Sequence, residues 1–233
     1  MSRPALRRAL RRAGLSSQPK ERRASGPRSR GITPPPRVFL PGESVTDEPA
    51  CFGQLFGRVA PIEIEIGTGR GRFIFAEARE HPERDFLGIE VVPDYVRIAQ
   101  VKIARLGLTN LRVEWLDGRE FVKLRLARES VHAIHVYFSD PWPKKRHHKR
   151  RVFQPDFVEA AASALVRGGL FKAASDHLEY WEDIVKTLDA CDELERLEAA
   201  AIEGWQTGTD YEKKFLAVGR TIGKGIWRKR HQI

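Results

Sequence analysis

From residue 60 onward, the chain alternates two kinds of apolar pattern. Short runs rich in β-branched residues are typical of strands, whereas apolar residues spaced three or four positions apart are typical of amphipathic helices. The strand pattern occurs at 62–66, 86–90, 111–115, 133–138 and 170–174, and a last extended region is expected at 214–218. The helix pattern occurs at 71–80, 93–106, 155–167 and 178–188.

Strands that alternate with helices predict an α/β fold, in which a mostly parallel sheet carries helices on both faces. Ligands of such sheets bind at the carboxyl ends of the strands, near the point where the strand order reverses. Polar or glycine-rich positions follow four of the predicted strands, at 65–71, Glu90, Asp117 and Asp140. Because parallel strands end at the same edge of a sheet, this pattern predicts a single site.

The positive charge is unevenly distributed along the chain. The 233 residues carry a net charge of +10, and residues 1–37 alone hold eleven Lys or Arg against one acid. The remaining chain is therefore neutral overall, and its basic residues gather at 144–151 and 224–230. Local basic patches on a neutral body favour the binding of RNA at a defined place.

Residues 1–45 are rich in Arg, Ser, Pro and Gly, so we expect a basic, largely disordered arm ahead of one domain at 46–233. Contact with RNA is the function that we favour for this arm. A passive solvated tail and an organelle transit peptide are the open alternatives.

No run of the sequence approaches the roughly 18 apolar residues that a membrane span needs, so we expect a soluble protein without membrane contact. Cys51 and Cys191 lie far apart and belong to no Cys-x-x-Cys pair. Two isolated cysteines predict a reducing compartment, here the cytoplasm, and no metal site. The sequence leaves a monomer and a homodimer equally open.

The first predicted strand runs into a Gly-Thr-Gly-Arg-Gly turn at 67–71, which opens the first helix. Small residues let a ligand approach the backbone closely, and the start of a helix offers free N–H groups. Arg72 stands where a dinucleotide-binding Gly-x-Gly-x-x-Gly motif has its third glycine, which argues against a nicotinamide-dependent oxidoreductase. Glu65 would repel a pyrophosphate and suits a cation such as an ammonium or a sulfonium.

Two further acids stand at the ends of the next two strands. Glu90 follows Gly67 by 23 positions, close to the offset of about 20 residues at which an acid binds ribose hydroxyls. Asp117 is placed to accept a hydrogen bond from an adenine amino group, although Asp117-Gly118 is also a common turn. Acids at three successive strand ends together favour an adenosyl ligand.

The most informative segment begins at Asp140, which heads a rigid Pro-Trp-Pro corner. Six Lys or Arg and two His fill positions 144–151. A carboxylate beside such a run indicates a reactive or recognising group next to a surface for a polyanionic backbone. His147 and His148 are adjacent, which fits phosphate or sugar contact, or exposure, better than metal binding. Trp142 is a candidate for base stacking, although a core anchor is the preferred interpretation.

These motifs together resemble the tRNA (guanine-N7)-methyltransferases, which are class I enzymes that use S-adenosylmethionine. The resemblance covers about residues 60–220 and rests on the segments 65–71, 139–151 and 209–215, the last of which reads Thr-Asp-Tyr-Glu-Lys-Lys-Phe. The second and third segments are the specific ones. The resemblance implies a Rossmann-like domain with a seven-stranded, mostly parallel sheet. It also implies methylation of N7 of a guanine, at position forty-six, in the tRNA variable loop.

The resemblance also implies roles for individual residues. The S-adenosylmethionine site would comprise Glu65, Gly67, Gly69, Gly71, Glu90, Asp117 and Asp140, and Asp140 would also be catalytic. The substrate guanosine would contact Lys144, Asp176, Thr209, Asp210, Tyr211 and Glu212. The RNA would lie along Arg146, His147, His148, Lys149, Arg150 and Arg151.

One position departs from the family pattern. Where family members typically carry Lys-Thr-Asp, this chain has Ala174-Ser175-Asp176, which puts in doubt a lysine contact from that strand. Asp176 has a second interpretation, because Asp176-x-x-Glu179 is a capping-box pattern that would open the next helix. We weigh the substrate and capping roles of Asp176 equally.

Guanine N7 carries an in-plane lone pair, so its methylation by a sulfonium is an in-line displacement that needs no general base. The protein must align donor and acceptor and place negative charge near the purine, for which Asp140 and Glu212 are the candidates. Two alternatives stay open, namely a non-catalytic RNA-binding module on this scaffold and a methyltransferase that acts on a different RNA.

Overall fold

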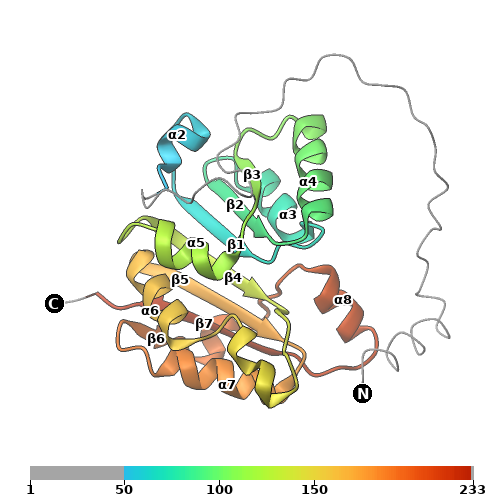
Figure 1. Cartoon of the computed structure of the whole chain (residues 1–233), viewed down its shortest axis with the longest axis vertical. Coiled ribbons are helices and arrows are strands. Elements are labelled where there is room, and N and C mark those ends of the chain that lie inside the picture. The colour runs from blue at the N-terminus through green and yellow to red at the C-terminus, as the bar shows by residue number, and fades with distance from the viewer. Residues whose placement is uncertain (1–49, 232–233) are drawn as a thin grey trace. The chain divides into compact units, whose positions relative to one another are not determined.

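The computed structural model describes residues 50–231, and Figure 1 shows them as a sheet covered by helices on both faces. Residues 1–49 and 232–233 lie outside the described residues, and with them the predicted arm at 1–45 and its boundary with the domain. The strands are β1 (Ile62–Ile66), β2 (Asp85–Glu90), β3 (Leu111–Trp115), β4 (Val131–Tyr137), β5 (Leu165–Ser175), β6 (Leu194–Arg196) and β7 (Gly223–Lys229). The α-helices are α2 (Phe52–Phe56), α3 (Arg72–Glu80), α4 (Pro93–Leu106), α5 (Gly118–Arg125), α6 (Pro155–Ala164), α7 (Leu178–Asp189) and α8 (Asp210–Leu216). Two 3₁₀ helices are η1 (Lys145–Arg150) and η2 (Ala199–Ile202).

The strand order is β3-β2-β1-β4-β5-β7-β6, and it reverses between β1 and β4. The strands from β1 to β5 pair in parallel, and β7 runs antiparallel between β5 and β6. This confirms the predicted Rossmann-like arrangement with a seven-stranded, mostly parallel sheet. The carboxyl ends of β1 to β4 therefore share one edge of the sheet, where the predicted acids stand.

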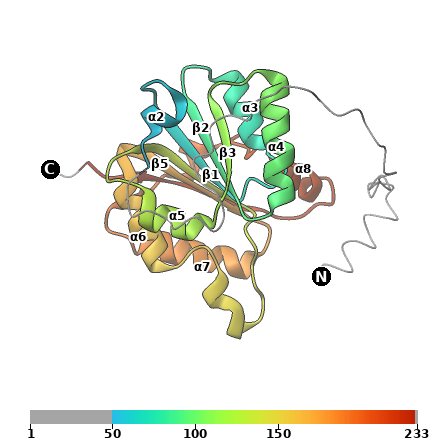
Figure 2. The ribbon, with the colours of Figure 1, turned by 45° about the horizontal axis from the view of Figure 1, so that its top comes forward.

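The Ile-Glu-Ile-Glu-Ile sequence of β1 is buried along its whole length. Successive side chains of a strand point to opposite faces, and the three isoleucines pack into the core cluster that includes residues of α5, α6 and α7. Glu63 and Glu65 therefore face the other side of the sheet, where α3 and α4 contribute to a second cluster. Figure 2 shows these two groups of helices on opposite sides of the sheet. The alternation in β1 thus places two carboxyl groups in the interior.

The predicted extended region at 214–218 is wrong, because most of this segment belongs to α8 and the last strand is β7. The Thr209 side chain caps α8, and the Glu and Lys residues that follow are good helix formers. The two glycines of β7 concealed its strand pattern. Gly223 is needed there because a Cβ at this position would lie 2.2 Å from the ring of Trp181.

The boundary between α6 and β5 also differs from the prediction. The helix expected to reach residue 167 ends at Ala164, and β5 begins at Leu165 without a connecting loop. The glycine pair at 168–169 lies inside β5, close to a shift in its pairing with β4. The short elements α2, α5 and β6 were not predicted.

Within residues 50–231, no helix is both long and apolar enough to cross a membrane. The same residues contain no group of three or more His, Cys, Asp or Glu side chains that could hold a metal ion. Cys51 and Cys191 are both free thiols.

Candidate active site

The glycine turn between β1 and α3 leaves open space beside its backbone. Gly67, Gly69 and Gly71 all have positive φ angles, of 80°, 55° and 73°. A Cβ at Gly67 or Gly69 would meet no atom within 4 Å, whereas one at Gly71 would lie 2.8 Å from the Phe75 ring. Gly71 is thus fixed by packing and backbone conformation, while the other two border free space that a ligand can enter.

Glu90 connects the end of β2 to this turn. Its carboxylate accepts hydrogen bonds from the backbone N–H of Gly69 at 2.7 Å and from that of Val92 at 2.9 Å. The side chain is buried. Sequence reasoning assigned this acid to a ribose, and the structure adds that it holds the glycine turn in place.

Glu65 is the buried acid at the end of β1. It is 4% exposed, and its Oε2 has no hydrogen-bond partner among the described residues. Burial, followed by the charges of Glu90 and Glu77, raises the pKa of Glu65 well above its usual value. A buried carboxyl without a partner is costly. A cationic ligand beside it would remove that cost, so Glu65 and the open turn fit the ammonium or sulfonium end of S-adenosylmethionine.

Asp117 stands at the end of β3 and is the N-cap of α5. Its Oδ1 accepts hydrogen bonds from the backbone N–H of Arg119 at 2.9 Å and of Glu120 at 3.2 Å. The side chain is exposed at the same sheet edge as Glu90. The Asp117-Gly118 pair is therefore the start of a helix rather than a simple turn. The cap orients the carboxylate and leaves it exposed at this edge.

The end of β4 carries Asp140 and is covered by α8. Phe138 has a positive φ of 53°, and its N–H donates to the carbonyl of Ala174 at 2.8 Å. Its ring centroid lies 6.0 Å from that of Tyr211 and 5.6 Å from that of Phe215. Asp140 follows two residues later and is exposed. The aromatic contacts bring the third sequence motif, on α8, next to the Asp140 motif.

Glu212 of α8 lies inside the protein and is engaged there. Its Oε2 accepts from the Thr207 hydroxyl at 2.9 Å and from the Gly208 N–H at 3.0 Å. Its Oε1 lies 3.3 Å from the Lys224 ammonium, and the side chain is 2% exposed. Thr209 accepts from the Glu212 N–H at 3.1 Å as the cap of the helix. These contacts make Glu212 an organiser of α8.

The two other predicted residues of α8 lie at its surface. Asp210 forms an ion pair of 3.0 Å with Arg72, the first residue of α3, so α8 is fastened beside the glycine turn. Tyr211 is 56% exposed, and its ring stacks on Phe215. Tyr211 therefore presents an aromatic face at the carboxyl edge of the sheet.

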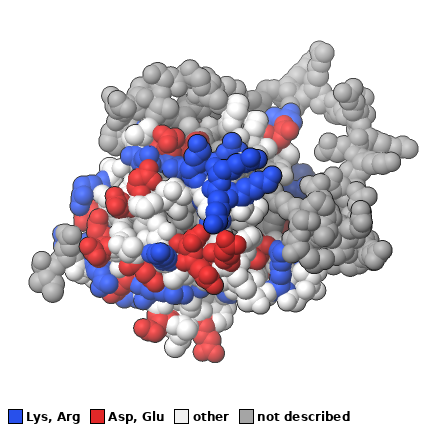
Figure 3. Space-filling model, turned by 60° about the horizontal axis from the view of Figure 1, so that its bottom comes forward, with Lys and Arg blue, Asp and Glu red and all other residues white. Residues whose placement is uncertain are grey.

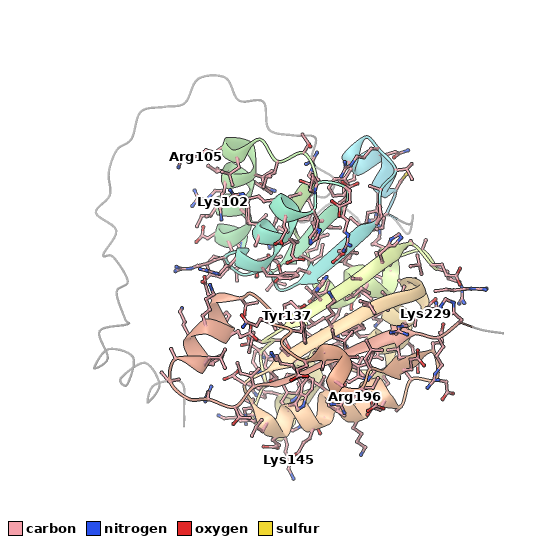
Figure 4. The ribbon with its side chains drawn as sticks, turned by 180° about the vertical axis from the view of Figure 1, so that it is seen from behind. Lys102, Arg105, Tyr137, Lys145, Arg196 and Lys229 are labelled. Atoms are coloured by element: carbon pink, nitrogen blue, oxygen red, sulfur yellow. The ribbon has the colours of Figure 1, made fainter. Side chains whose placement is uncertain are left out.

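The basic segment forms η1 and stands out from the domain. Figure 3 shows Lys and Arg side chains gathered on this face next to acidic ones, and Figure 4 shows Lys145 directed away from the sheet. Trp142 is half-buried and lies outside the core clusters, which corrects its interpretation as a core anchor. Its ring centroid lies 5.9 Å from that of His147 and 5.0 Å from the Arg150 guanidinium. The Trp142 ring thus packs against two side chains of η1.

Arg151 does not share the exposure of its neighbours. It is 3% exposed, donates from Nε to the Pro141 carbonyl at 2.8 Å and forms an ion pair with Asp183 of α7. Its guanidinium also lies 4.7 Å from the centre of the Tyr180 ring. This residue therefore closes the loop from 141 to 151 and fastens it to α7, and it is not exposed like the cations of η1.

Asp176 is not the cap of α7. The N-cap is His177, whose Nδ1 accepts from the Tyr180 N–H at 3.3 Å. Asp176 instead forms an ion pair with Arg220. The capping-box interpretation is thus wrong, because the helix begins one residue later than that pattern requires. The carboxylate of Asp176 stays half-buried at the carboxyl end of β5.

The departure at Ala174 has a structural counterpart on the neighbouring strand. Ala174 is buried and lies opposite Lys224 of β7. Residues opposite each other in a sheet project to the same face, and the Lys224 ammonium reaches Glu212. Lys224 therefore supplies a cation on the face where the family's lysine would stand.

Sequence reasoning missed a buried polar chain behind the site. Arg84 donates to Glu63 at 2.7 Å, His135 Nε2 lies 2.8 Å from the second Glu63 oxygen, and His135 Nδ1 lies 2.8 Å from the Tyr137 hydroxyl. Although burial opposes ionisation, the His135 hydrogen bond and Arg84 bring the pKa of Glu63 to about 2. Burial lowers the pKa of His135, and the hydrogen bond to Glu63 opposes that shift. The signal was the alternation of polar residues at 63 and 65 in β1 and at 135 and 137 in β4.

The fold and the site together define a class I methyltransferase architecture, with a glycine turn after β1 and acids at the ends of β1, β2, β3 and β4. A solved structure described as an antibiotic-related methyltransferase has the same fold. It matches with a TM-score of 0.51 and 19% identity, over 78% of this chain and 92% of the other.

Sequence comparisons give the family. The family model described as "Putative methyltransferase" matches residues 59–224. A tRNA (guanine-N(7)-)-methyltransferase of Alkalilimnicola ehrlichii is 37% identical over 186 residues, which cover 78% of each chain. One of Halorhodospira halophila is 39% identical over 191 residues, which cover 82% of this chain and 79% of the relative. The chain belongs to the tRNA (guanine-N7)-methyltransferase family, and it is an enzyme.

Proposed function

We propose that this protein transfers a methyl group from S-adenosylmethionine to N7 of a guanine in tRNA, and that the guanine is position forty-six of the variable loop. One observation carries the proposal: the buried carboxyl of Glu65, whose Oε2 has no hydrogen-bond partner among the described residues, lies beside the open glycine turn, on the sheet edge that also ends in Asp140. The activity named for the relatives supports the same reaction.

The cofactor has a matching set of residues at this edge. Glu65 would balance the cationic end, the backbone at Gly67 and Gly69 would lie against the ligand, and Glu90 and Asp117 would receive the ribose and the adenine. When bound, S-adenosylmethionine supplies an electrophilic methyl group on a sulfonium. The protein contributes orientation and electrostatics, because guanine N7 attacks with its own lone pair.

The acceptor base belongs on the Asp140 side of the edge. Asp140 would accept hydrogen bonds from the guanine edge and place negative charge beside a purine that becomes cationic. The exposed ring of Tyr211 lies next to Phe138, two residues before Asp140, and offers a stacking face for an unstacked base. Lys144, Asp176, Thr209 and Asp210 would surround the guanosine.

The RNA backbone would follow η1, through Arg146, His147, His148, Lys149 and Arg150. Neutralisation of phosphates by these cations releases counterions, so affinity should fall steeply with salt. We extend the proposal to residues 1–45 as a basic RNA-contacting arm ahead of the domain at 46–233, because the segment 1–37 holds eleven cations and one acid. The two free thiols, Cys51 and Cys191, support action in the reducing cytoplasm.

The test is transfer of labelled methyl to unmodified tRNA, followed by chain cleavage at N7-methylguanine. A single labelled guanine in the variable loop is expected for the full chain. Asp140→Asn should lower the rate about 100-fold or more while the protein stays folded and binds tRNA. Asp192→Asn is the matched control, because Asp192 is an exposed acid just before β6, at the opposite edge of the sheet. Transfer to another base, or an Asp140→Asn variant as fast as the control, would overturn the assignment.

A further inference from the structure

A cavity lies outside the site described above. It has a volume of about 480 Å³ and opens between the start of α6 and the end of α7, behind η1. Residues that line it include His148, Arg151, Val158, Asp183, Lys186 and Cys191. None of the residues assigned to the cofactor or to the methylated guanosine lines it. Its volume falls in the range of about 300–1,000 Å³ that is typical of small-ligand sites.

Two buried polar atoms in the wall of the cavity lack hydrogen-bond partners. The Nη2 of the buried Arg151 and the Nε2 of His148 are both inaccessible to water and have no hydrogen-bond partner among the described residues. Unsatisfied buried donors are uncommon and costly, so a ligand that offers acceptors gains from meeting them. This applies with most force to Arg151, because its other contacts hold it rigidly in place.

The charges in the cavity indicate the kind of ligand. Two cationic residues, Arg151 and Lys186, face two acidic ones, Asp183 and Glu159, so the lining is balanced rather than basic. Apolar side chains such as Val158 complete the wall. A free phosphate would favour a net positive pocket. A neutral heterocycle with donors, acceptors and apolar faces matches the balanced one.

The surroundings of the cavity indicate where such a heterocycle comes from. His148 and Arg151 belong to the same loop as the exposed cations Lys149 and Arg150. A nucleotide whose base enters the cavity would leave its phosphate at these cations. We propose that the cavity between α6 and α7 binds an unpaired base of the RNA substrate, distinct from the guanine that is methylated. This inference rests on the proposed function, since it takes tRNA as the ligand of η1.

The two cysteines of the chain provide a direct probe. Cys191 lines the cavity, whereas Cys51 is exposed at the start of α2. Burial raises the pKa of the Cys191 thiol, so alkylation is followed at pH 9 for the full chain, with mass spectrometry at each cysteine. Each of the four nucleoside 5′-monophosphates, and separately unmodified tRNA, is added in turn. At least one mononucleotide, and tRNA, should slow alkylation of Cys191 about fivefold or more and leave Cys51 unchanged.

A variant that fills the cavity separates base insertion from simple coverage of its mouth. Ala190→Trp projects a ring into the cavity from the end of α7, and Ala104→Trp on α4 is the matched control at an exposed alanine. The first variant should lose protection by the mononucleotide and bind tRNA about five- to tenfold more weakly. Its affinity for S-adenosylhomocysteine and its thermal midpoint should equal those of the control.

Two outcomes would overturn the proposal. If no mononucleotide slows the alkylation of Cys191, the cavity does not bind a base. Mononucleotide protection together with unchanged tRNA binding by Ala190→Trp would make the cavity a site for a free nucleotide instead of RNA. Failure of the proposed function would be recognised by another result: the wild-type chain would transfer no methyl group to tRNA, whether or not a nucleotide occupies the cavity.

Discussion

The backbone N–H of Gly69 donates to the carboxylate of Glu90 over 2.7 Å, so the acid that ends β2 also holds the turn that follows β1. The same carboxylate accepts from the N–H of Val92. One side chain therefore fixes the conformation of the turn and remains at the sheet edge where a ribose would lie. This dual role makes the cofactor site depend on Glu90 beyond any direct contact.

Glu90→Gln should weaken cofactor binding by about as much as the loss of one hydrogen bond to a charged group. The amide offers a single acceptor oxygen, and its NH₂ group opposes one of the two backbone donors. A hydrogen bond to a charged group contributes about 1.5–3 kcal/mol, so the dissociation constant for S-adenosylhomocysteine should rise about 10- to 100-fold. Titration calorimetry measures it. Glu80→Gln, an exposed acid at the end of α3, should bind like the wild type.

Glu65→Gln should stabilise the free protein and weaken its binding of the cofactor. The pKa of this carboxyl is raised by burial and by Glu90, so ionisation opposes folding. Stability from such a group is complete below its unfolded pKa, near 4.5, and is lost as pH rises towards the folded value. Urea unfolding of the variant should therefore show a smaller loss of stability from pH 5 to pH 8 than the wild type. Equal pH dependence of stability in the two proteins would mean that folding does not raise the pKa of Glu65.

The same substitution tests what the carboxyl recognises. If Glu65 balances the sulfonium, Glu65→Gln should reduce affinity for S-adenosylmethionine more than for S-adenosylhomocysteine, whose sulfur is uncharged. If it balances the amino group, both ligands should weaken alike, since both carry the ammonium. Calorimetric titrations with the two ligands distinguish these cases. A variant that binds both as tightly as the wild type would remove Glu65 from the site.

The sequence predicted the parallel strands β1 to β5 because each contains a short apolar run bounded by turns. It also predicted which acids end those strands, since an acid after such a run stands at the carboxyl edge. It did not reveal that Glu63 and Glu65, two residues apart in β1, have different surroundings. Glu63 meets Arg84 and His135, whereas Oε2 of Glu65 has no partner. That difference arises from contacts between distant segments.

The errors have two different origins. The extended region predicted at 214–218 lacked a strong local signal, and the cap formed by Thr209 decided for a helix. The run at 144–151 was interpreted as one surface for the RNA backbone, but Asp183 lies 32 residues after Arg151 and draws that side chain into the interior. Local composition therefore cannot predict which residue of a charge run is buried by an ion pair with a distant segment.

The polar chain behind the site should make the protein sensitive to acid. The pKa of Glu63 is about 2, so its stabilising contribution is present above the unfolded value of 4.5 and is lost as pH falls towards 2. The difference corresponds to at most about 3 kcal/mol at neutral pH. Glu63→Gln should be less stable than the wild type at pH 7, and this difference should shrink at pH 3. Urea unfolding at both pH values measures it, with Glu80→Gln as the control.

Arg150 and Arg151 are adjacent in the sequence and should give opposite results when each is replaced by alanine. Arg150 is exposed on η1, so Arg150→Ala should leave stability unchanged, weaken tRNA binding and lower the slope of log affinity against log salt by about one. Arg151 is buried against Pro141, Tyr180 and Asp183, so Arg151→Ala should cost about 2–4 kcal/mol of folding free energy. Urea unfolding and filter binding at several salt concentrations measure the two properties in parallel. An Arg150→Ala variant that unfolds early, or an Arg151→Ala variant of full stability and a reduced salt slope, would show that the loop presents its charges in another way.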